Sequence, residues 1–364
     1  MKDKLYAFWL CNIPGIGCRK IEALLQYFGS PKGIFEANQN HFDAIQNLNQ
    51  KDKEKIFWNR KEENVIQQYH ETKQKGIRFC YQEEEDFPEN LKQIPDAPYG
   101  LFYKGNLPKK EMPAVAIVGA RQASYEARQL AQKFGKELAE NGIQVISGMA
   151  RGVDISAQRG ALETVRGRTY AVLGNGVDIC YPREHIEEYM LMQENGGVIS
   201  EFPIKTPSMP YHFPMRNRII SGLSDGILVI SAKKGSGSLI TAEAGLEQGK
   251  EIFVLPGSIT DSQFEGSNQL IQNGAALVTK VRDILDGLGL FFDMDATERK
   301  KNSEVMLETA EKIVYAILSL EPVHISQIAD ETGLELQQIM EILLSLQMKQ
   351  LVQSIGNNYY AIKL

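Results

Sequence analysis

The spacing of apolar and polar positions changes along the chain, and each change marks a different region. In residues 1–86, apolar side chains recur at helical intervals, as at Ile21, Leu24 and Phe28, and Gly29 follows as a helix stop. This pattern predicts a helical N-terminal domain.

The region from residue 87 to residue 287 alternates short apolar runs with stretches of helical periodicity. The apolar runs lie at residues 114–119, 143–148, 169–174, 196–202, 225–231 and 251–257. Buried strands separated by helices need crossover connections, which make the strands parallel and place helices on both faces of the sheet. The region is therefore predicted to be an α/β domain with a Rossmann-like, doubly wound and mostly parallel sheet.

The last part of the chain is predicted to be a small separate module. Residues 288–304 are interpreted as a linker. Within residues 305–364, three helical stretches are followed by two strands that join at Gly356, Asn357 and Asn358. Three helices followed by a hairpin are typical of a winged helix.

Composition indicates an ordinary globular chain, with 43% hydrophobic and 24% charged residues. No run of eighteen apolar residues predicts a membrane span, and the N-terminus has no apolar core of a signal peptide. The four cysteines, at positions 11, 18, 80 and 180, form no CxxC pair and lie near no histidine at metal-ligand spacing. We therefore expect a cytoplasmic protein without a metal site or a membrane segment.

The net charge of −6 argues mildly against nucleic acid as a partner. Its distribution points the other way, because residues 109–240 carry sixteen Lys/Arg against thirteen Asp/Glu. The rest of the chain carries 24 against 33. Basic residues are thus concentrated in the middle of the predicted sheet domain.

Glycines, hydroxyl groups and cations follow several of the predicted strands. Gly119 and Arg121 come after the first strand, and Ser147, Gly148 and Arg151 come after the second. In a doubly wound sheet, ligands bind beyond the carboxyl ends of the strands, so these residues are predicted to meet at one edge. An exposed arginine there can form a forked contact with a phosphate. The alternative for Arg121 is a structural ion pair with a neighbouring carboxylate such as Asp154 or Glu201.

A glycine-rich turn opens a predicted helix after the fifth strand. It contains Lys233, Lys234, Gly235, Ser236, Gly237 and Ser238, and Thr241 follows within the helix. Glycines allow close approach of an anion, and the first helical N–H groups have no partners within the helix. The turn is therefore predicted to bind phosphate, with an ordinary helix start as the alternative. Neither a Walker A loop nor a GxGxxG fingerprint is present.

A basic run, Arg216–Asn217–Arg218, follows the aromatic residues Tyr211 and Phe213. Cations interleaved with aromatics suit single-stranded nucleic acid, because bases stack while phosphates pair with the cations. The alternative is a solvated helix start whose aromatics lie in the core. The sequence does not say which of the two aromatic residues faces a base.

Few residues suit catalysis. Asp154 and Glu201 are the carboxylates near the predicted edge, and Asp154 also fits as a helix N-cap. His185 and His212 show no triad pattern. We therefore predict no catalytic residue, no metal and no cofactor.

The N-terminal segment Ile13–Gly17, followed by Lys20, resembles a helix-hairpin-helix of a SAM-like domain. Glycines of such a hairpin offer N–H groups to a DNA phosphate. Residues 1–85 hold thirteen basic and twelve acidic residues, so the charge of the region does not decide between DNA contact and a purely structural hairpin.

Several of these motifs occur in one order along the chain. The order is IVGAR (117–121), SGMARGVDISAQRGAL (147–162), VLGNGVDICYP (172–182), ISEFP (199–203), FPMRNRIISG (213–222) and GSNQLIQNGAALV (266–278). Across roughly residues 88–285 this set resembles the DNA-processing protein A (DprA/Smf) family, whose members also carry a helix-hairpin-helix and a winged helix. The resemblance implies a homodimeric protein, not an enzyme, that binds single-stranded DNA and helps to load RecA recombinase during natural transformation.

The resemblance also implies the site. Arg121 matches the arginine of the family's VGxR motif, residues 216–218 match its RNR-like run, and residues 235–238 with Thr241 match its glycine-rich anion loop. The predicted DNA-binding residues are Gly119, Arg121, Ser147, Gly148, Arg151, Arg216, Asn217, Arg218, Lys233, Lys234, Gly235, Ser236, Gly237, Ser238 and Thr241.

Two other functions compete with DNA binding. Nucleoside-monophosphate phosphoribohydrolases of the LOG type have a similar core with a PGGxGT motif and a glutamate; here the loop is KKGSGS, and Glu243 follows Thr241. A transcription regulator that reads duplex DNA through the winged helix is the third possibility.

Overall fold

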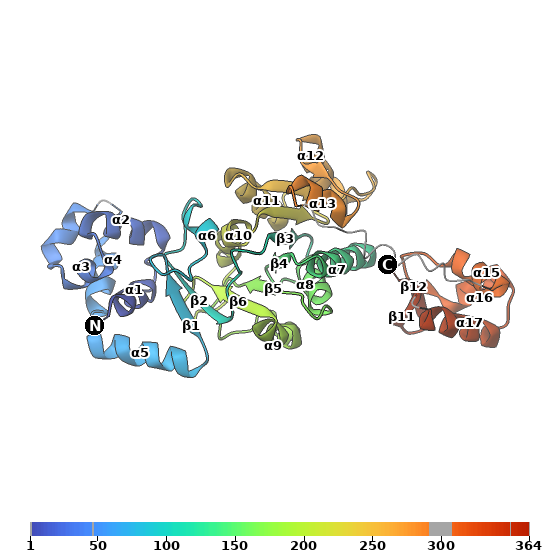
Figure 1. The fold of residues 1–364 in the computed structure, drawn as a ribbon, viewed down its shortest axis with the longest axis horizontal. Helices are drawn as coiled ribbons and strands as arrows, with labels where there is room; N and C mark the ends of the chain where they lie inside the picture. Colours follow the sequence, from blue (N-terminus) through green and yellow to red (C-terminus); the bar gives the residue numbers. More distant parts are fainter. Residues whose placement is uncertain (1, 46, 291–307, 350, 364) are drawn as a thin grey trace.

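The computed structural model describes residues 2–45, 47–290, 308–349 and 351–363. N-terminal helices, a central sheet covered by helices and a C-terminal module follow one another along the longest axis (Figure 1). The predicted linker, 288–304, lies outside the described residues from position 291 onward.

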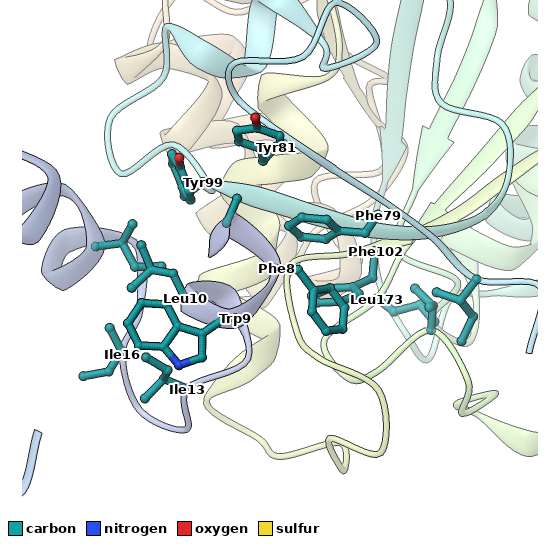
Figure 2. Close-up of a cluster of buried hydrophobic side chains, with 14 of the residues drawn as sticks. Phe8, Trp9, Leu10, Ile13, Ile16, Phe79, Tyr81, Tyr99, Phe102 and Leu173 are labelled. Atoms are coloured by element: carbon teal, nitrogen blue, oxygen red, sulfur yellow. The ribbon is translucent and has the colours of Figure 1, made fainter. Parts of the chain in front are cut away.

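The N-terminal region is helical, as predicted. Its elements are α1 (Asp3–Cys11), α2 (Cys18–Phe28), α3 (Pro31–Glu36), the 3-10 helix η1 (Gln39–Ala44), α4 (Gln50–Trp58) and α5 (Glu62–Gln74). Gly29 ends α2 in a left-handed conformation (φ 76°), as expected of a helix stop. Figure 2 shows Phe8 of α1 beside Phe79 and Phe102 of the sheet, so this region shares a core with the central domain.

Among the described residues, the central sheet has nine strands in the order β1-β2-β6-β5-β4-β3-β7-β8-β9. The strands are β1 (Arg78–Tyr81), β2 (Gly100–Gly105), β3 (Ala114–Val118), β4 (Gln144–Ser147), β5 (Thr169–Val172), β6 (Gly196–Ser200), β7 (Gly226–Val229), β8 (Glu251–Val254) and β9 (Ala276–Leu277). In sheet order, the strands from β6 through β9 run parallel to one another, whereas β2 pairs antiparallel with both β1 and β6. The prediction of a mostly parallel sheet is confirmed.

The sheet begins at Arg78, because β1 pairs with β2 in register from Arg78↔Tyr103 to Tyr81↔Gly100. The predicted domain boundary at residues 86 and 87 therefore falls between two strands of one sheet. The short helix α6 (Glu89–Lys92) lies in the same connection.

Helices cover both faces of the sheet, as the doubly wound prediction requires. They are α7 (Tyr125–Glu140), α8 (Val153–Leu162), η2 (Arg183–His185), α9 (Ile186–Glu194), α10 (His212–Gly222), α11 (Gly237–Glu247), η3 (Ser262–Phe264), α12 (Glu265–Gln272) and α13 (Val281–Gly287). Alternate residues of β3 face opposite sides: Val115 and Ile117 pack with α7, whereas Ala116 and Val118 pack with α10. Because both faces are buried, the strand is apolar at every position.

The C-terminal module is a winged helix with a core of its own. It contains α15 (Thr309–Ile317), α16 (Ile325–Thr332) and α17 (Leu336–Met348), with a sheet of β10 (Val323–His324), β12 (Tyr359–Ile362) and β11 (Val352–Gly356). The predicted three helices and hairpin are present. Across the described residues, the helices lack the length and apolarity that a membrane span needs.

Candidate nucleic-acid interface

A cavity of about 460 Å³ opens at the carboxyl edge of the sheet, beside β3 and β7. The chain leaves β3 toward β4 on one side, and β7 lies on the other side. Such a switch point is where open α/β sheets bind ligands. The loop after β3, the first turns of α10 and part of the glycine-rich turn with the start of α11 line the cavity, together with Gln263 of η3.

Arg121 is exposed at this cavity on the loop that follows β3. The amide of Ala120 donates to the carbonyl of Ser231 at 2.9 Å, and the amide of Val153 donates to the carbonyl of Ala120 at 3.2 Å. The loop is thus fixed to two neighbouring segments. The Cζ of Arg121 lies 5.5 Å from the ring centroid of Phe213, which leaves the planar guanidinium at the cavity wall.

The structural ion pairs considered for Arg121 are not made within the described residues. Glu201 is bound to Arg218 at 2.7 Å, and Asp154 is buried beside Gly148. Since Arg121 is exposed and its charge is not neutralised by a carboxylate of the described chain, it is available to an anion.

The glycine-rich turn leaves the start of α11 without a side-chain cap. Gly235 has φ 72°, a left-handed value that favours glycine, and α11 begins at Gly237. The hydroxyl groups of Ser236 and Ser238 bond to each other at 2.8 Å, so neither caps the helix. The first N–H groups of α11 therefore remain available to a ligand in the cavity.

The side chains of this turn divide into two groups. Lys233, Ser236, Gly237, Ser238 and Thr241 line the cavity. Lys234 and Gly235 belong to the same turn but are not part of the lining. The cation of the turn that reaches the cavity is thus the first of the two lysines.

Arg216, the first cation of the basic run, is buried. It is only 4% exposed and forms the base of the cavity. Its Nη1 donates to Gly148 O at 3.0 Å and to Val172 O, and its Nε donates to Asn217 Oδ1. Burial lowers the pKa of Arg216 to about 10, while Asp154 acts in the opposite direction. Arg216 therefore joins the ends of β4 and β5 to α10.

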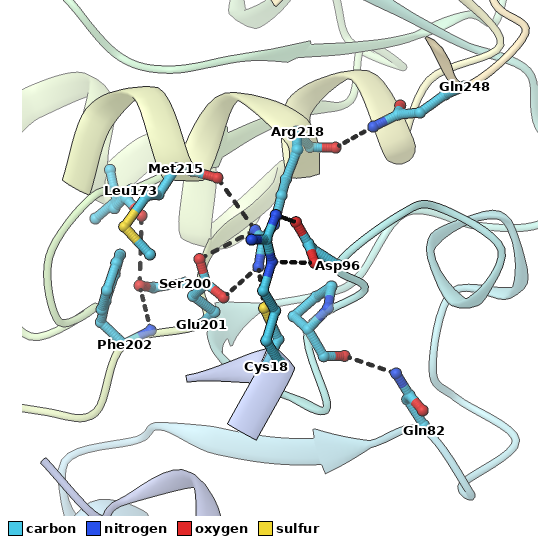
Figure 3. A network of polar contacts seen from close by, with 12 residues as sticks. Cys18, Gln82, Asp96, Leu173, Ser200, Glu201, Phe202, Met215, Arg218 and Gln248 are labelled. Atoms are coloured by element: carbon cyan, nitrogen blue, oxygen red, sulfur yellow. Dashed lines mark hydrogen bonds and ion pairs between the residues drawn. The ribbon is translucent and has the colours of Figure 1, made fainter. Parts of the chain in front are cut away.

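Arg218 lies outside the cavity lining, unlike Arg216 and Asn217. Its guanidinium forms a bidentate contact with Glu201, at 3.1 and 2.7 Å, and reaches Cys18 Sγ at 3.5 Å (Figure 3). Nearby, Arg19 binds Asp96 through two hydrogen bonds of 2.7 and 2.6 Å. Arg218 thus contributes to the attachment of α2 to the central domain. Asn217, which lies between Arg216 and Arg218 in the sequence, lines the cavity.

The residues after β4 support the cavity from behind or beside it. Ser147 is buried and donates to Ile117 O at 2.6 Å, and the amide of Gly148 donates to Asp154 Oδ2 at 3.1 Å. Arg151 is exposed but paired with Glu184, at 2.7 and 2.8 Å, and it is not part of the lining.

Asp154 does not cap α8, because the N-cap is Gly152 and Asp154 is the second residue of the helix. Burial raises the pKa of Asp154, and the charge of Arg216 and the amide of Gly148 oppose that effect. Asp154 and Arg216 therefore belong to one buried polar network under the cavity.

Some residues of the cavity carry no sequence signal. Gln122 and Ala150 lie in loops whose neighbours were predicted, and Gln263 comes from a 3-10 helix with no recognisable motif. The structure also separates the two aromatic candidates. Phe213 lines the cavity, whereas Tyr211 is 60% exposed and lies outside the lining.

Other candidate groups are engaged in structure. His212 Nδ1 lies 3.0 Å from Gly174 O, and His185 Nδ1 lies 3.0 Å from Met149 O. Lys20 of the N-terminal hairpin is paired with Asp52 at 2.8 Å. In the described part of the chain, no three His, Cys, Asp or Glu side chains gather as metal ligands.

Comparison with known proteins identifies the family. Residues 78–289 match the family model of DNA recombination-mediator protein A, and residues 298–358 match the DprA winged helix domain. Protein Smf of Escherichia coli (strain K12) is 37% identical over 286 residues, which cover 77% of this chain and 76% of that protein.

Two solved structures extend the similarity to the fold. DNA processing protein A from Streptococcus pneumoniae has a TM-score of 0.69 and 32% identity, covering 79% of this chain and 98% of that one. DNA processing protein A from Helicobacter pylori, whose structure is described as showing a unique single-stranded DNA binding mode, has a TM-score of 0.53 and 28% identity, covering 59% and 97%. The chain with the cavity beside β3 and β7 therefore belongs to the DNA recombination-mediator protein A (DprA/Smf) family.

Proposed function

We propose that this protein binds single-stranded DNA at the cavity beside β3 and β7. The observation that carries the proposal is the meeting of three elements in one cavity: the exposed Arg121, the open N-terminus of α11 with Lys233, and the ring of Phe213. Cations and helix N–H groups suit phosphates, and an aromatic ring suits a base. The family member from Helicobacter pylori, described as binding single-stranded DNA, supports this assignment.

The residues divide into two roles under this proposal. Those that contact DNA are Gly119, Arg121, Asn217, Lys233, Ser236, Gly237, Ser238 and Thr241, all of which line the cavity. Ser147, Gly148 and Arg216 hold the surrounding backbone in place. Arg218 acts at the attachment of the N-terminal region instead.

The wider role that we propose is in DNA recombination. The protein would act in the cytoplasm as a homodimer that helps to load RecA recombinase onto incoming single strands during natural transformation. Membership of the recombination-mediator family supports this role.

A binding experiment tests the proposal directly. Affinity for a single strand and for a duplex of equal length is measured over a salt series by fluorescence anisotropy. We expect the protein to prefer the single strand and to be insensitive to its sequence. The logarithm of the affinity should fall linearly with the logarithm of the salt concentration, with a slope of about −0.7 per released counterion. Equal affinity for the duplex would contradict the proposal.

The competing hydrolase function is disfavoured by the position of its glutamate. Glu243 is exposed on α11 and does not line the cavity. A general acid or base must lie within hydrogen-bond reach of the substrate. Incubation with AMP should therefore release no free base, and measurable release would favour the enzyme.

A further inference from the structure

Arg151 was predicted to contact DNA, yet it lies outside the cavity, on the loop between β4 and α8. Its side chain is 62% exposed and paired with Glu184 of η2. The position of this cation depends on a second loop, which runs from the end of β5 to η2 and contains Tyr181.

Two contacts join these loops into one surface. His185 Nδ1 lies 3.0 Å from Met149 O, and the Arg151 guanidinium forms its bidentate pair with Glu184. The histidine is buried, so the loop after β4 is fixed against the segment that follows Tyr181.

Tyr181 extends the aromatic wall of the cavity outward. Its ring centroid lies 5.6 Å from that of Phe213, with an angle of 30° between the planes. The Phe213 ring also lies 5.5 Å from the Cζ of Arg121, and a Cβ added at Gly174 would come within 3.1 Å of this ring. Tyr181 is 43% exposed, so part of its ring is open to solvent. An exposed aromatic ring beside a nucleic-acid cavity is what a stacked base requires.

We propose that Tyr181 and Arg151 form a second nucleotide subsite next to the cavity, in which the Tyr181 ring stacks on a base and Arg151 contacts the adjoining phosphate. The subsite rests on the proposed binding of single-stranded DNA. It defines a path for the strand, which runs from the glycine-rich turn past Phe213 to the loop after β5.

The partner of Arg151 decides how readily it can bind a phosphate. Glu188, the buried carboxylate nearby, is bound to Arg159 at 2.6 Å. Glu184 is therefore the carboxylate that competes with a phosphate for Arg151, and it is 52% exposed. Exposed ion pairs contribute little to stability, so a DNA phosphate can replace Glu184 as the partner of Arg151.

The test compares a long and a short ligand on the full chain. Fluorescently labelled oligothymidylate of twelve nucleotides spans both subsites, and a thymidine dinucleotide with a 5′-phosphate serves as the short competitor. Tyr181→Leu, which keeps an apolar side chain against Phe213, should weaken binding of the long strand by about five-fold or more, the lower end of one base–aromatic stack. Tyr181→Leu should bind the dinucleotide as tightly as the wild-type chain does. Tyr181→Phe should bind both ligands with wild-type affinity.

Two further variants test the charge. Glu184→Gln should tighten binding of the long strand about two-fold or more. Arg151→Ala should reduce the slope of log affinity against log salt concentration by about 0.7. Tyr27→Ala is the matched control, because Tyr27 is also exposed but lies on α2.

The outcomes separate the two proposals. No binding of the long strand by the wild-type chain would overturn the proposed function. If the wild-type chain binds the long strand, and Tyr181→Leu and Glu184→Gln bind it with the same affinity, the subsite alone is overturned. An equal loss for both ligands in Tyr181→Leu would also overturn it, because the defect would then lie in the cavity.

Discussion

The guanidinium of Arg216 occupies the space in which a side chain at position 148 would lie. A Cβ at Gly148 would come within 2.5 Å of Arg216 Nη2 and 2.7 Å of its Cζ. The same glycine accepts a hydrogen bond from Arg216 through its carbonyl and donates one to Asp154 through its amide. The base of the cavity therefore depends on close contact between the backbone after β4 and a buried cation of α10.

Gly148→Ala should destabilise the protein and weaken its binding to single-stranded DNA. The added methyl must displace the Arg216 guanidinium from its carbonyl partners, and overpacking of this kind costs about 1–3 kcal/mol. Thermal unfolding and anisotropy measure the two effects. Gly237→Ala is the control for stability, because its added Cβ meets no atom within 4 Å. If the thermal unfolding midpoints of Gly148→Ala and Gly237→Ala are equal, Arg216 moves aside without loss of stability.

Arg121→Ala should weaken single-strand binding about ten-fold or more, because a hydrogen bond to a charged group contributes about 1.5–3 kcal/mol. Arg121→Lys should restore binding only in part, since lysine lacks the planar fork. Unfolding midpoints should not change, because Arg121 is exposed. Wild-type affinity in a folded Arg121→Ala protein would rule out the assigned contact.

The two lysines of the glycine-rich turn should differ in their effect on salt dependence. Lys233 lines the cavity and Lys234 does not. Lys233→Gln should reduce the slope of log affinity against log salt by about 0.7, the value of one released counterion on a single strand. Lys234→Gln serves as the neighbouring control and should change the slope less. Equal slopes in the two variants would argue against the arrangement described for the turn.

The winged helix should not bind DNA by itself. Residues 305–364 carry seven acidic and three basic residues, and Lys349 is engaged with Glu311 at 2.6 Å. On α17, the helix that would enter a groove, Leu336, Met340 and Leu344 are more than half exposed. Phosphate binding needs the opposite charge.

A titration of residues 300–364 with duplex and single-stranded DNA at roughly 0.1 M salt checks this expectation, since the screening length is then about 10 Å. Saturable micromolar binding would contradict it. Removal of the same residues from the full chain should leave single-strand affinity nearly unchanged.

Stability of the winged helix should fall in acid through Glu311. Hydrogen bonds from Lys349, Ser345 and the amide of Glu308 hold the pKa of Glu311 at about 2, below its ordinary value of 4.5. A carboxyl group with a lowered pKa stabilises the folded state above its unfolded pKa, and that contribution is lost as pH falls through the folded pKa. The loss should therefore occur between pH 4.5 and about 2.

Thermal unfolding of residues 300–364 measures this effect across pH. The wild-type fragment should be more stable than Glu311→Gln at pH 7, and the difference should disappear as pH approaches 2. A difference that is constant with pH would show that the ionised carboxyl group is not responsible.

The strands that could be predicted from sequence share one property. Residues 114–118, 144–147, 169–172 and 226–229 are buried at every position and are mostly apolar, so each stands out as a short run between helices. The two-residue strand β9 is too short to produce such a run. The antiparallel strands β1 and β2 were missed as well. β1 begins only a few residues after α5 ends, and its first residue, Arg78, is exposed.

Sequence reasoning found cavity residues where they follow a strand, as Arg121 does, or where a glycine opens a helix, as Gly237 does. The direction in which each arginine of the basic run on α10 points could not be predicted from the sequence. Arg216 turns toward Gly148 and Arg218 toward Glu201, and both partners come from distant segments. On a helix buried on more than one side, sequence spacing shows which residues lie apart but not what each one meets.

The pairing of β3 with β7 has a consequence for the order in which the protein can fold during synthesis. Ala114 and Asp225, joined by a hydrogen bond of 2.8 Å, are 111 positions apart in the chain. While the ribosome is still making the intervening residues, β3 can pair with β4 but presents an open edge on its other side. Long-range pairing is slow and unpaired edges attract other chains, so we expect the emerging protein to be most prone to association with other chains until β7 arrives. Only then do the two halves of the cavity meet.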